Sequence, residues 1–408
     1  MAVNLSIPDD KSVFPVAGVQ LGVACAGIKK SGRKDLLIIS LPEGSAVAGV
    51  FTRNRFCAAP VLIAKSHITQ TPSRALIVNS GCANAGTGAQ GVARAMQVCE
   101  AVGEMLACEA SAVLPFSTGV ILEDLPTERI LAALPVCVQT LSETAWLDAA
   151  QAIMTTDTVP KAVSHNVDIA GHKVTVTGIA KGSGMIRPNM ATMLAFIATD
   201  AAVSTKALQT IIEHASQRSF NCITVDGDTS TNDSAMLMAT GVSSCPKILG
   251  VDAEGYAPLR ETVTAVCTEL AQMLIRDGEG ATKFITILVE SGRDEEECRH
   301  VAYAIAHSPL VKTAFYASDP NLGRILAAIG YAGIDDLDVA ALDVYLGDVL
   351  VATGGGRAPG YKEESAQAVM NRQEIALRVC LNRGSAAVTV WTCDLSPEYV
   401  SINADYRS

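Results

Sequence analysis

The chain has 408 residues and a formal net charge of −11, and 49% of its residues are hydrophobic while only 18% are charged. A chain of this length and composition can bury a large core, which excludes general disorder and favours two domains over one. The negative charge and the lack of a Lys/Arg cluster exclude nucleic acid as the main partner, because binding a phosphate backbone requires a basic surface.

Strands and helices alternate along the first half of the chain. Residues 75–78 are predicted to form a short buried strand, and a Gly-rich loop begins at Asn79. A helix should follow, with an apolar face made by Val92, Met96, Cys99, Val102 and Leu106. Residues 172–179 alternate like a strand, and the apolar residues 193–198 predict a second, buried strand.

The second half continues the same alternation. Ser204 is placed to cap a helix, and a longer helix is predicted over residues 259–273, before a strand over 284–289. The composition shifts near residue 290, where a charged stretch opens another helix, so we predict a domain boundary there. The Gly-rich residues 353–360 are interpreted as a flexible turn inside the second domain.

Targeting signals and cysteine patterns bound the cellular context. The first residues, MAVNLSIPDDK, lack the apolar region of a secretory signal, and no apolar run is long enough to span a bilayer. We therefore expect a cytoplasmic protein with no membrane partner. None of the twelve cysteines forms a Cys-x-x-Cys pair or lies beside His at zinc-ligand spacing, so reduced thiols and no metal site are expected.

Four polar, Gly-rich stretches stand out in this apolar chain. They are Asn79–Gly88, Lys181–Thr192, Asp226–Asp233 and Asp277–Lys283. Glycine lets the backbone approach a ligand closely and point N–H groups at it. A tight loop is the simpler interpretation of any one of them, but four such stretches behind apolar strands indicate a functional role.

The stretch KGSGMIRPNMATML, residues 181–194, resembles the cleavage and nucleophile segment of the glutamate/ornithine N-acetyltransferase family, the arginine-biosynthesis bifunctional proteins. GVACAGIK near the start, NSGCANAGTG, the TTDT of residues 155–158, DGDTSTND, RDGEGATKF, DPNLGRI and the terminal NADYRS resemble the same family in the same order. The resemblance therefore covers essentially the whole chain. Without it, a threonine between hydrophobic residues would be interpreted as an ordinary strand residue.

The resemblance implies a self-cleaving acetyltransferase. The precursor would cut itself between Ala191 and Thr192, giving an α chain (1–191) and a β chain (192–408). Thr192 would gain an α-amine, whose pKa of about 7.7–8.0 suits a base near neutral pH. Its hydroxyl would take the acetyl group from N-acetylornithine, release ornithine and pass the group to glutamate. N-acetylglutamate would be the product.

The resemblance also assigns site residues. Thr118 and Gly119 would form the oxyanion hole with a hydroxyl and a backbone N–H. The substrate-binding positions of the family fall on Thr155, Lys181, Thr192, Glu279, Asn403 and Ser408. Lys181 would bind the α-carboxylate and Glu279 an ammonium group, although solvated surface charges are the simpler interpretation of both. The tail would fold back onto the site, whereas chain ends ordinarily fray.

Two residues depart from the family pattern. Leu122 stands where the family often has Gly, which bears on the turn after the oxyanion hole. Leu322 stands where the family commonly has Trp, and we expect it to affect packing or an interface.

The fold implied by the resemblance is layered α/β. A four-layer α/β/β/α sandwich, of the N-terminal-nucleophile-like aminopeptidase and ornithine acetyltransferase type, would span residues 1–285. A smaller α/β domain would span 286–394, and the tail 395–408 would return to the active site. Two α and two β chains would form a heterotetramer. No cofactor is implied, and the sequence leaves open whether acetyl-CoA is also a co-substrate.

Two other functions were weighed against this one. An N-terminal-threonine amidohydrolase or aminopeptidase would use the same self-cut threonine but pass the acyl group to water, so it would not need glutamate. A non-enzymatic metabolite-binding protein would keep an intact chain and form no acetyl-enzyme.

Overall fold

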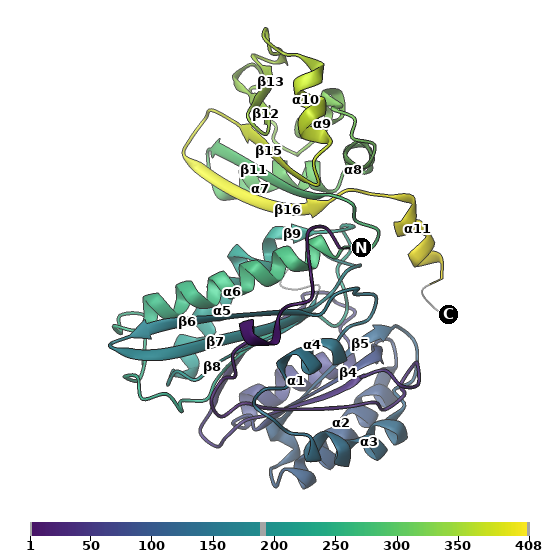
Figure 1. Cartoon of the computed structure of the whole chain (residues 1–408), viewed down its shortest axis with the longest axis vertical. Coiled ribbons are helices and arrows are strands. Elements are labelled where there is room, and N and C mark those ends of the chain that lie inside the picture. The colour runs from purple at the N-terminus through teal and green to yellow at the C-terminus, as the bar shows by residue number, and fades with distance from the viewer. Residues whose placement is uncertain (1, 188–192, 406–408) are drawn as a thin grey trace. The chain divides into compact units, whose positions relative to one another are not determined.

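The computed structural model describes residues 2–187 and 193–405 and divides into two compact units (Figure 1). The larger unit comprises Ile7–Asn221 and Asp228–Leu274. The smaller unit comprises Met1–Ser6, Cys222–Gly227 and Ile275–Ser408. The smaller unit thus begins ten residues before the boundary predicted from composition and recruits two short segments from earlier in the chain.

The larger unit contains two β-sheets. A four-stranded sheet has the order β1-β2-β4-β5, and a five-stranded sheet has the order β3-β10-β8-β7-β6. The strands of the first are β1 (Gln20–Ala24), β2 (Leu36–Ser40), β4 (Ala75–Cys82) and β5 (Val113–Val120). Those of the second are β3 (Ala46–Phe51), β10 (Ser234–Ala239), β8 (Leu194–Thr199), β7 (His172–Lys181) and β6 (Lys161–Ile169).

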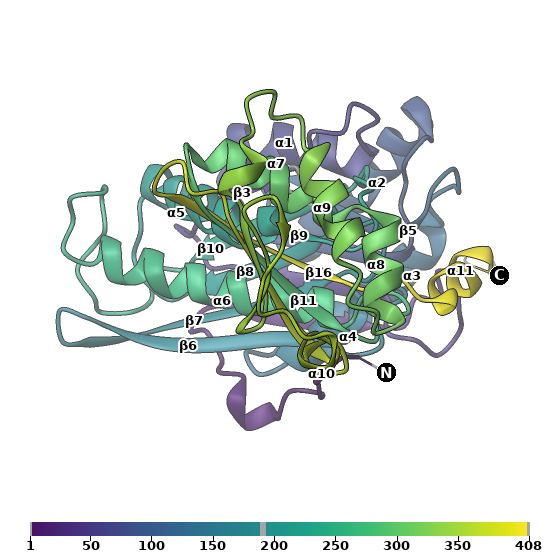
Figure 2. The same ribbon diagram turned by 90° about the horizontal axis from the view of Figure 1, so that it is seen from above.

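Six helices accompany these sheets. They are α1 (Ala59–Gln70), α2 (Gly88–Met105), α3 (Thr127–Gln139), α4 (Trp146–Ala152), α5 (Thr205–Arg218) and α6 (Tyr256–Arg276). The predicted cap of α5 is confirmed, since Ser204 Oγ accepts a hydrogen bond from the Ala207 N–H at 3.2 Å. The long antiparallel ribbon of β6 and β7 can be followed in Figure 2.

Alternating side chains build the layers of the larger unit. Successive residues of a strand point to opposite faces of its sheet. In β2, Leu37 and Ile39 join the core between the two sheets, while Leu36 and Ile38 join the core under α2 and α3. The rings of Phe116 in β5 and Phe196 in β8 meet edge to face with centroids 5.2 Å apart.

Helices cover the outer face of the five-stranded sheet as well. Helix α5 packs on β3 and β10. Val266 and Leu270 of α6 lie against Gly178 of β7, where a side chain would come within 3.0 Å of them. Helices thus lie outside two sheets that face each other, which confirms the predicted α/β/β/α sandwich.

The smaller unit is built on one mixed sheet of seven strands in the order β14-β13-β12-β15-β11-β16-β9. These strands are β9 (Ile223–Thr224), β11 (Phe284–Gly292), β12 (Asp343–Leu346), β13 (Val349–Thr353), β14 (Gly356–Arg357), β15 (Glu374–Cys380) and β16 (Ala386–Cys393). Its helices are α7 (Glu295–Ala306), α8 (Pro309–Tyr316), α9 (Leu322–Gly330), α10 (Glu363–Met370) and α11 (Pro397–Ala404). Strand β11 is central to this sheet, which explains why the unit begins before residue 285.

Two local predictions need correction. The predicted strand over 75–78 continues to Cys82, because Asn79, Ser80 and Gly81 pair with β5. The stretch 353–360, interpreted as a flexible turn, contains β14, which pairs with β13 through Ala352 and Thr353. In both places glycines suggested a loop where strand pairing through backbone groups holds the chain.

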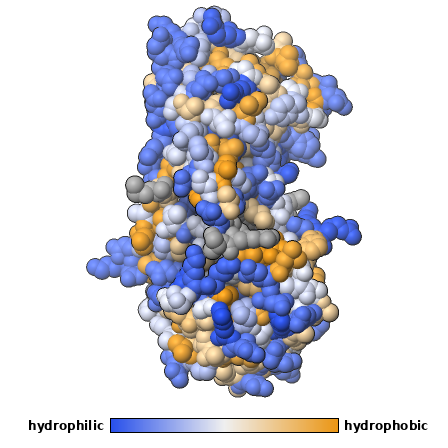
Figure 3. Space-filling model, turned by 90° about the vertical axis from the view of Figure 1, so that its right-hand side faces the viewer, coloured by the Kyte–Doolittle hydropathy of each residue, from blue (hydrophilic) through white to orange (hydrophobic). Residues whose placement is uncertain are grey.

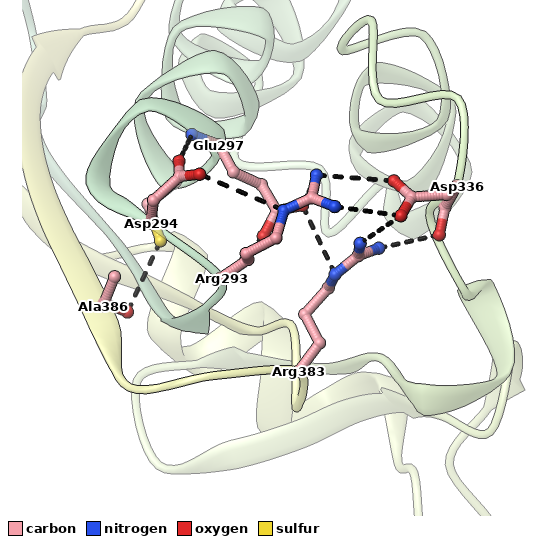
Figure 4. A network of polar contacts seen from close by, with 7 residues as sticks. Arg293, Asp294, Glu297, Asp336, Arg383 and Ala386 are labelled. Carbon is pink, nitrogen blue, oxygen red and sulfur yellow. Dashed lines mark hydrogen bonds and ion pairs between the residues drawn. The ribbon is translucent and has the colours of Figure 1, made fainter.

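A charged network ties the start of α7 to two loops of the smaller unit (Figure 4). Arg293 and Arg383 both reach Asp336, at 3.0 Å and 2.7 Å. Arg383 also lies 3.3 Å from Glu297, whose side chain is almost fully buried. Asp294 caps α7 by accepting a hydrogen bond from the Glu297 N–H at 2.8 Å. The arginines therefore neutralise a carboxylate that would be costly to bury alone.

The surface mixes polar and apolar residues on the face shown in Figure 3. Among the described residues, no helix is both long and apolar enough to cross a membrane. The twelve cysteines are all free thiols, and most are buried, although Cys25 is exposed.

Candidate active site

Strands β4 and β5 come together at a pair of glycines where both strands end. Gly81 pairs with Gly119, and both have positive φ angles, of 108° and 135°. A Cβ atom on Gly119 would lie 2.3 Å from the carbonyl carbon of Gly81. Only glycine fits such a close approach, so the residue after Thr118 can carry no side chain.

Buried amide and hydroxyl groups tie three segments together beside these glycines. Ser117 Oγ donates to Asn79 Oδ1 at 2.6 Å, and Asn79 Nδ2 donates to the Cys82 carbonyl at 2.9 Å. Asn232 Nδ2 donates to the carbonyls of Ala83 and Ser117, at 2.6 and 2.9 Å. The stretch 79–88, the end of β5 and the loop 228–233 are therefore joined by hydrogen bonds rather than by apolar packing.

Lys181 brings three predicted site residues together at the end of β7. Its Nζ donates to Thr155 Oγ1 at 2.6 Å and to Thr118 Oγ1 at 3.2 Å. The side chain is largely buried, so Lys181 is no ordinary surface charge. A hydroxyl that accepts from Lys181 still has its own proton to donate. Thr118 is thus arranged as a donor whose polarity is increased by a neighbouring ammonium.

Asp157 holds this cluster in place. Its Oδ1 accepts from Lys161 Nζ at 2.8 Å and from the Gly182 N–H at 2.7 Å, and its Oδ2 accepts from the Thr155 N–H at 3.0 Å. Lys181 Nζ lies 4.0 Å from the same carboxylate. Burial by itself raises the pKa of Asp157, but Lys161, Lys181 and the Gly182 N–H outweigh it and hold the pKa below its ordinary value.

Sequence reasoning missed Asp157 and Lys161 as functional residues. The motif of residues 155–158 was noted, but only Thr155 was assigned a role. A carboxylate four residues before a lysine, both close to a Gly-rich stretch, was the available signal. Their burial could not be foreseen, because Asp and Lys are ordinarily exposed.

The predicted nucleophile Thr192 and its neighbour Ala191 lie outside the described residues. Thr192 is bonded to Met193, whose carbonyl accepts from the Ser234 N–H at 3.0 Å. The next residue, Leu194, pairs with Lys181 on one side of β8 and with Ser234 on the other. The described chain thus resumes between the Lys181 cluster and β10.

Asp233 is a second buried carboxyl group at this place. It precedes β10, and its side chain accepts from Ser230 and from the Met193 N–H. Its Oδ2 is buried and has no hydrogen-bond partner among the described residues. Burial raises the pKa of Asp233 well above its ordinary value, although Ser230 and Lys181 oppose the rise. Sequence reasoning assigned this residue no role.

Glu279 and Asn403 lie together in the smaller unit. Asn403 Nδ2 donates to Glu279 Oε2 at 2.8 Å, and Glu279 is buried. The tail helix α11 is held on the same loop, since Ser396 Oγ donates to the Gly280 carbonyl at 2.7 Å. The tail therefore returns to the loop that contains Glu279. Ser408 lies outside the described residues.

The two departures from the family pattern have structural explanations. Leu122 has a φ angle of 69° and is 68% exposed, so it occupies a backbone conformation that favours glycine. Leu322 opens α9 and is partly buried against the core of the smaller unit, where a residue of another size would pack differently.

The arrangement in the larger unit suits acyl transfer. It combines a glycine in close backbone contact, a hydroxyl donor and a buried ammonium, which together can stabilise an oxyanion. Among the residues the structure describes, no group of three or more His, Cys, Asp or Glu side chains is placed to hold a metal ion.

Comparisons with known proteins agree with this chemistry. The ArgJ family model matches residues 20–408. The solved structure of the arginine biosynthesis bifunctional protein ArgJ from Bacillus halodurans is 37% identical over 52% of this chain and 99% of its own, with a TM-score of 0.50. An ornithine acetyltransferase from Mycobacterium tuberculosis, solved with ornithine, is 36% identical over 43% of this chain and 94% of its own, with a TM-score of 0.38. The chain belongs to the ArgJ family, the glutamate/ornithine N-acetyltransferases that its motifs resemble, and is an acetyl-transferring enzyme of arginine biosynthesis.

Proposed function

We propose that the chain transfers the acetyl group of N2-acetyl-L-ornithine to L-glutamate through an acetyl ester on Thr192. The observation that carries this proposal is the contact between Lys181 Nζ and Thr118 Oγ1, 3.2 Å long and buried. It leaves the Thr118 hydroxyl proton to be donated, in a place that Met193 connects directly to Thr192. A donor aimed where negative charge develops is the main requirement of acyl transfer.

The oxyanion hole consists of the Thr118 hydroxyl and the Gly119 N–H. Each tetrahedral intermediate places a negative charge on the former acetyl oxygen. The ammonium of Lys181 polarises the Thr118 hydroxyl and favours this charge in a buried setting. Gly119 contributes because no side chain separates its backbone from the reacting atoms.

Substrate recognition combines one positive and one negative group. Lys181 binds the α-carboxylate that N-acetylornithine and glutamate share, with Thr155 as a second polar contact. Asp157 keeps Lys181 charged and in position. In the smaller unit Glu279, held by Asn403, accepts an ammonium group, and Ser408 completes the set by resemblance. These opposite charges suit amino-acid substrates.

The chain cuts itself between Ala191 and Thr192 before it turns over substrate. The comparison with Bacillus halodurans supports this step, since 52% of this chain accounts for 99% of that solved chain. A chain about half as long is what a separated α or β part would be. We further propose that two α and two β chains assemble into a heterotetramer in the cytoplasm.

Intact mass under denaturing conditions tests the proposal. Wild type should give two pieces, 1–191 and 192–408, whereas Thr192→Ala should stay whole at 42.5 kDa. N-acetylornithine should add about 42 Da to the second piece, as an acetyl ester requires. Thr199→Ala is the matched control, because Thr199 is a buried threonine at the other end of β8.

Two results would contradict the proposal. An uncut wild-type chain that never gains an acetyl group would indicate a binding protein. Acetyl release at the same rate with and without glutamate would indicate a hydrolase. Offering acetyl-CoA to the cut enzyme in place of N-acetylornithine decides whether it is also a co-substrate: the adduct forms only if it is.

A further inference from the structure

The Asp233 side chain is satisfied on one side only. It is 2% exposed, and Ser230 and the Met193 N–H donate to its carboxyl group. Oδ2 is buried without a hydrogen-bond partner among the described residues. An unpaired buried polar atom costs stability, so such an atom requires an explanation.

The neighbours of Asp233 show that polar groups here are otherwise paired. Thr231 donates to Asn232 Oδ1 at 2.6 Å, and the Asn232 amide nitrogen donates to two carbonyls. The loop 228–233 therefore has no general shortage of hydrogen bonds. The free oxygen belongs to the one residue of this loop that lies beside Met193.

Chain connectivity brings the scissile nitrogen close to this carboxyl group. The backbone nitrogens of consecutive residues are only about 3–4 Å apart. The Met193 N–H already donates to Asp233, and the preceding backbone nitrogen is that of Thr192. This is the nitrogen that leaves the Ala191 carbonyl when the chain is cut. A carboxyl oxygen with no other partner is available on the side of the chain where a donor is needed.

The charged and titratable groups around Asp233 come from two other elements. Lys181, at the end of β7, favours the ionised form of Asp233. Cys57, before α1, also faces Asp233, and its own charge is influenced by Lys65. Burial outweighs these groups and keeps the proton on Asp233, because it raises the pKa of this carboxyl group. A neutral carboxyl group is an acid that can donate at neutral pH.

We propose that Asp233 is the proton donor to the Thr192 nitrogen during self-cleavage. This inference rests on the proposed function. Thr192 Oγ forms a bond to the Ala191 carbonyl carbon and gives up its proton to water. The bond from that carbon to the Thr192 nitrogen breaks, and the nitrogen takes the Asp233 proton. An ester between Ala191 and Thr192 Oγ remains, which water hydrolyses.

The same residue acts on the cut enzyme. After the cut, the Asp233 carboxylate faces the new α-amine of Thr192. Opposite charges favour the ionised forms of both groups, so the carboxylate orients the ammonium that forms when the amine takes the Thr192 hydroxyl proton. Asp233 is then a positioning residue for the transfer reaction.

Self-cleavage of freshly synthesised chain tests the proposal. Wild type and Asp233→Asn are made by cell-free translation, and the 192–408 piece is followed over time by mass. Asparagine has the shape of aspartic acid but is no acid, so cutting should slow at least about tenfold. Asp200→Asn is the matched control: Asp200 is also buried with a raised pKa, but it lies beyond the other end of β8. It should cut at the wild-type rate.

The pH dependence provides a readout that a structural role would not change. The acid form of Asp233 donates, so the wild-type cutting rate should fall as pH rises through its raised pKa. Asp233→Asn should lose this alkaline limb. If the variant fails to fold, the wild-type profile alone decides: a falling alkaline limb supports the proposal, and its absence contradicts it.

Stability separates the proton donor from a structural residue. In the uncut Thr192→Ala background, Asp233→Asn should not lower the melting temperature at neutral pH. A group with a raised pKa in the fold contributes stability below its unfolded pKa and loses it as pH rises, so removing it at neutral pH should not destabilise. A wild-type chain that is never cut would refute the proposed function. Wild type and Asp233→Asn cutting at equal rates would refute only this inference.

Discussion

Asp157 and Lys161 form an ion pair whose side chains have no exposed surface, with Oδ1 and Nζ 2.8 Å apart. The pair fixes the backbone of Thr155 and Gly182 through the same carboxylate. Lys181, the predicted substrate ligand, is held between these two segments. A buried pair that binds no substrate thus sets the geometry of the residue that does.

Replacing Lys161 with Met should destabilise the larger unit strongly. The Asp157 carboxylate would stay buried without its nearest cation, which costs about 3–5 kcal/mol in unfolding free energy. Urea unfolding measures this loss. Lys29→Met is the control, since Lys29 and Glu123 form an exposed pair worth at most about 1 kcal/mol. Equal losses in the two variants would show that burial of the Asp157 pair is unimportant.

Acid should weaken the fold through Asp157. Its folded pKa lies below its ordinary value of 3.8, so its contribution is complete above that value and is lost as pH falls toward the folded pKa. Unfolding free energy measured from pH 6 to about pH 2 should therefore fall more steeply for wild type than for Asp157→Asn. Parallel curves would mean that Asp157 does not titrate as its contacts require.

Gly119→Ala should abolish acetyl-enzyme formation and lower stability. The new Cβ would lie 2.3 Å from the Gly81 carbonyl carbon, so β4 and β5 would have to separate at the oxyanion hole. Gly171→Ala is the control, because Gly171 also has a positive φ but has open space around it. It should cost only about 1–2 kcal/mol and leave the acetyl adduct unchanged. An active Gly119→Ala enzyme would place the oxyanion hole elsewhere.

Leu122→Gly should stabilise the fold slightly without changing the rate of acetyl transfer. A left-handed conformation costs a non-glycine residue about 1–2 kcal/mol, and the greater freedom of glycine in the unfolded chain returns about 0.4–1 kcal/mol of that gain. Melting temperature measures the difference. Leu249→Gly, at another exposed leucine without a positive φ, should not stabilise. A lower melting temperature for Leu122→Gly would contradict the strain argument.

Ending the chain after Ile402 should impair substrate binding more than stability. The truncation removes the Asn403 amide that donates to Glu279, while the Ser396 contact that holds α11 remains. Steady-state kinetics should show KM for N-acetylornithine rising about tenfold or more, because a lost hydrogen bond to a charged group costs about 1.5–3 kcal/mol. Ser401→Ala, an exposed position on the same helix, should keep the wild-type KM. A melting temperature that falls with no change in KM would make the tail purely structural.

Local patterns predicted most of the elements. The apolar runs at residues 193–198 and 284–289 are strands β8 and β11, and the spacing of Val92 and Cys99 gave the face of α2 correctly. Predictions were wrong where glycines occur in a strand, as at Gly81, because pairing with a neighbouring strand depends on residues far along the chain. The domain boundary was displaced for the same reason.

The sequence by itself determined the family, the layered fold and the order of the polar segments, since these depend on motifs and on apolar periodicity within short stretches. Only the tertiary structure decided which polar residues are buried and what they contact. Asp157 and Asp233 are both aspartates next to Gly-rich loops, yet Lys161 lowers the pKa of the first and burial raises the pKa of the second. A pKa depends on charges and solvent within a few ångströms, and only folding brings these together.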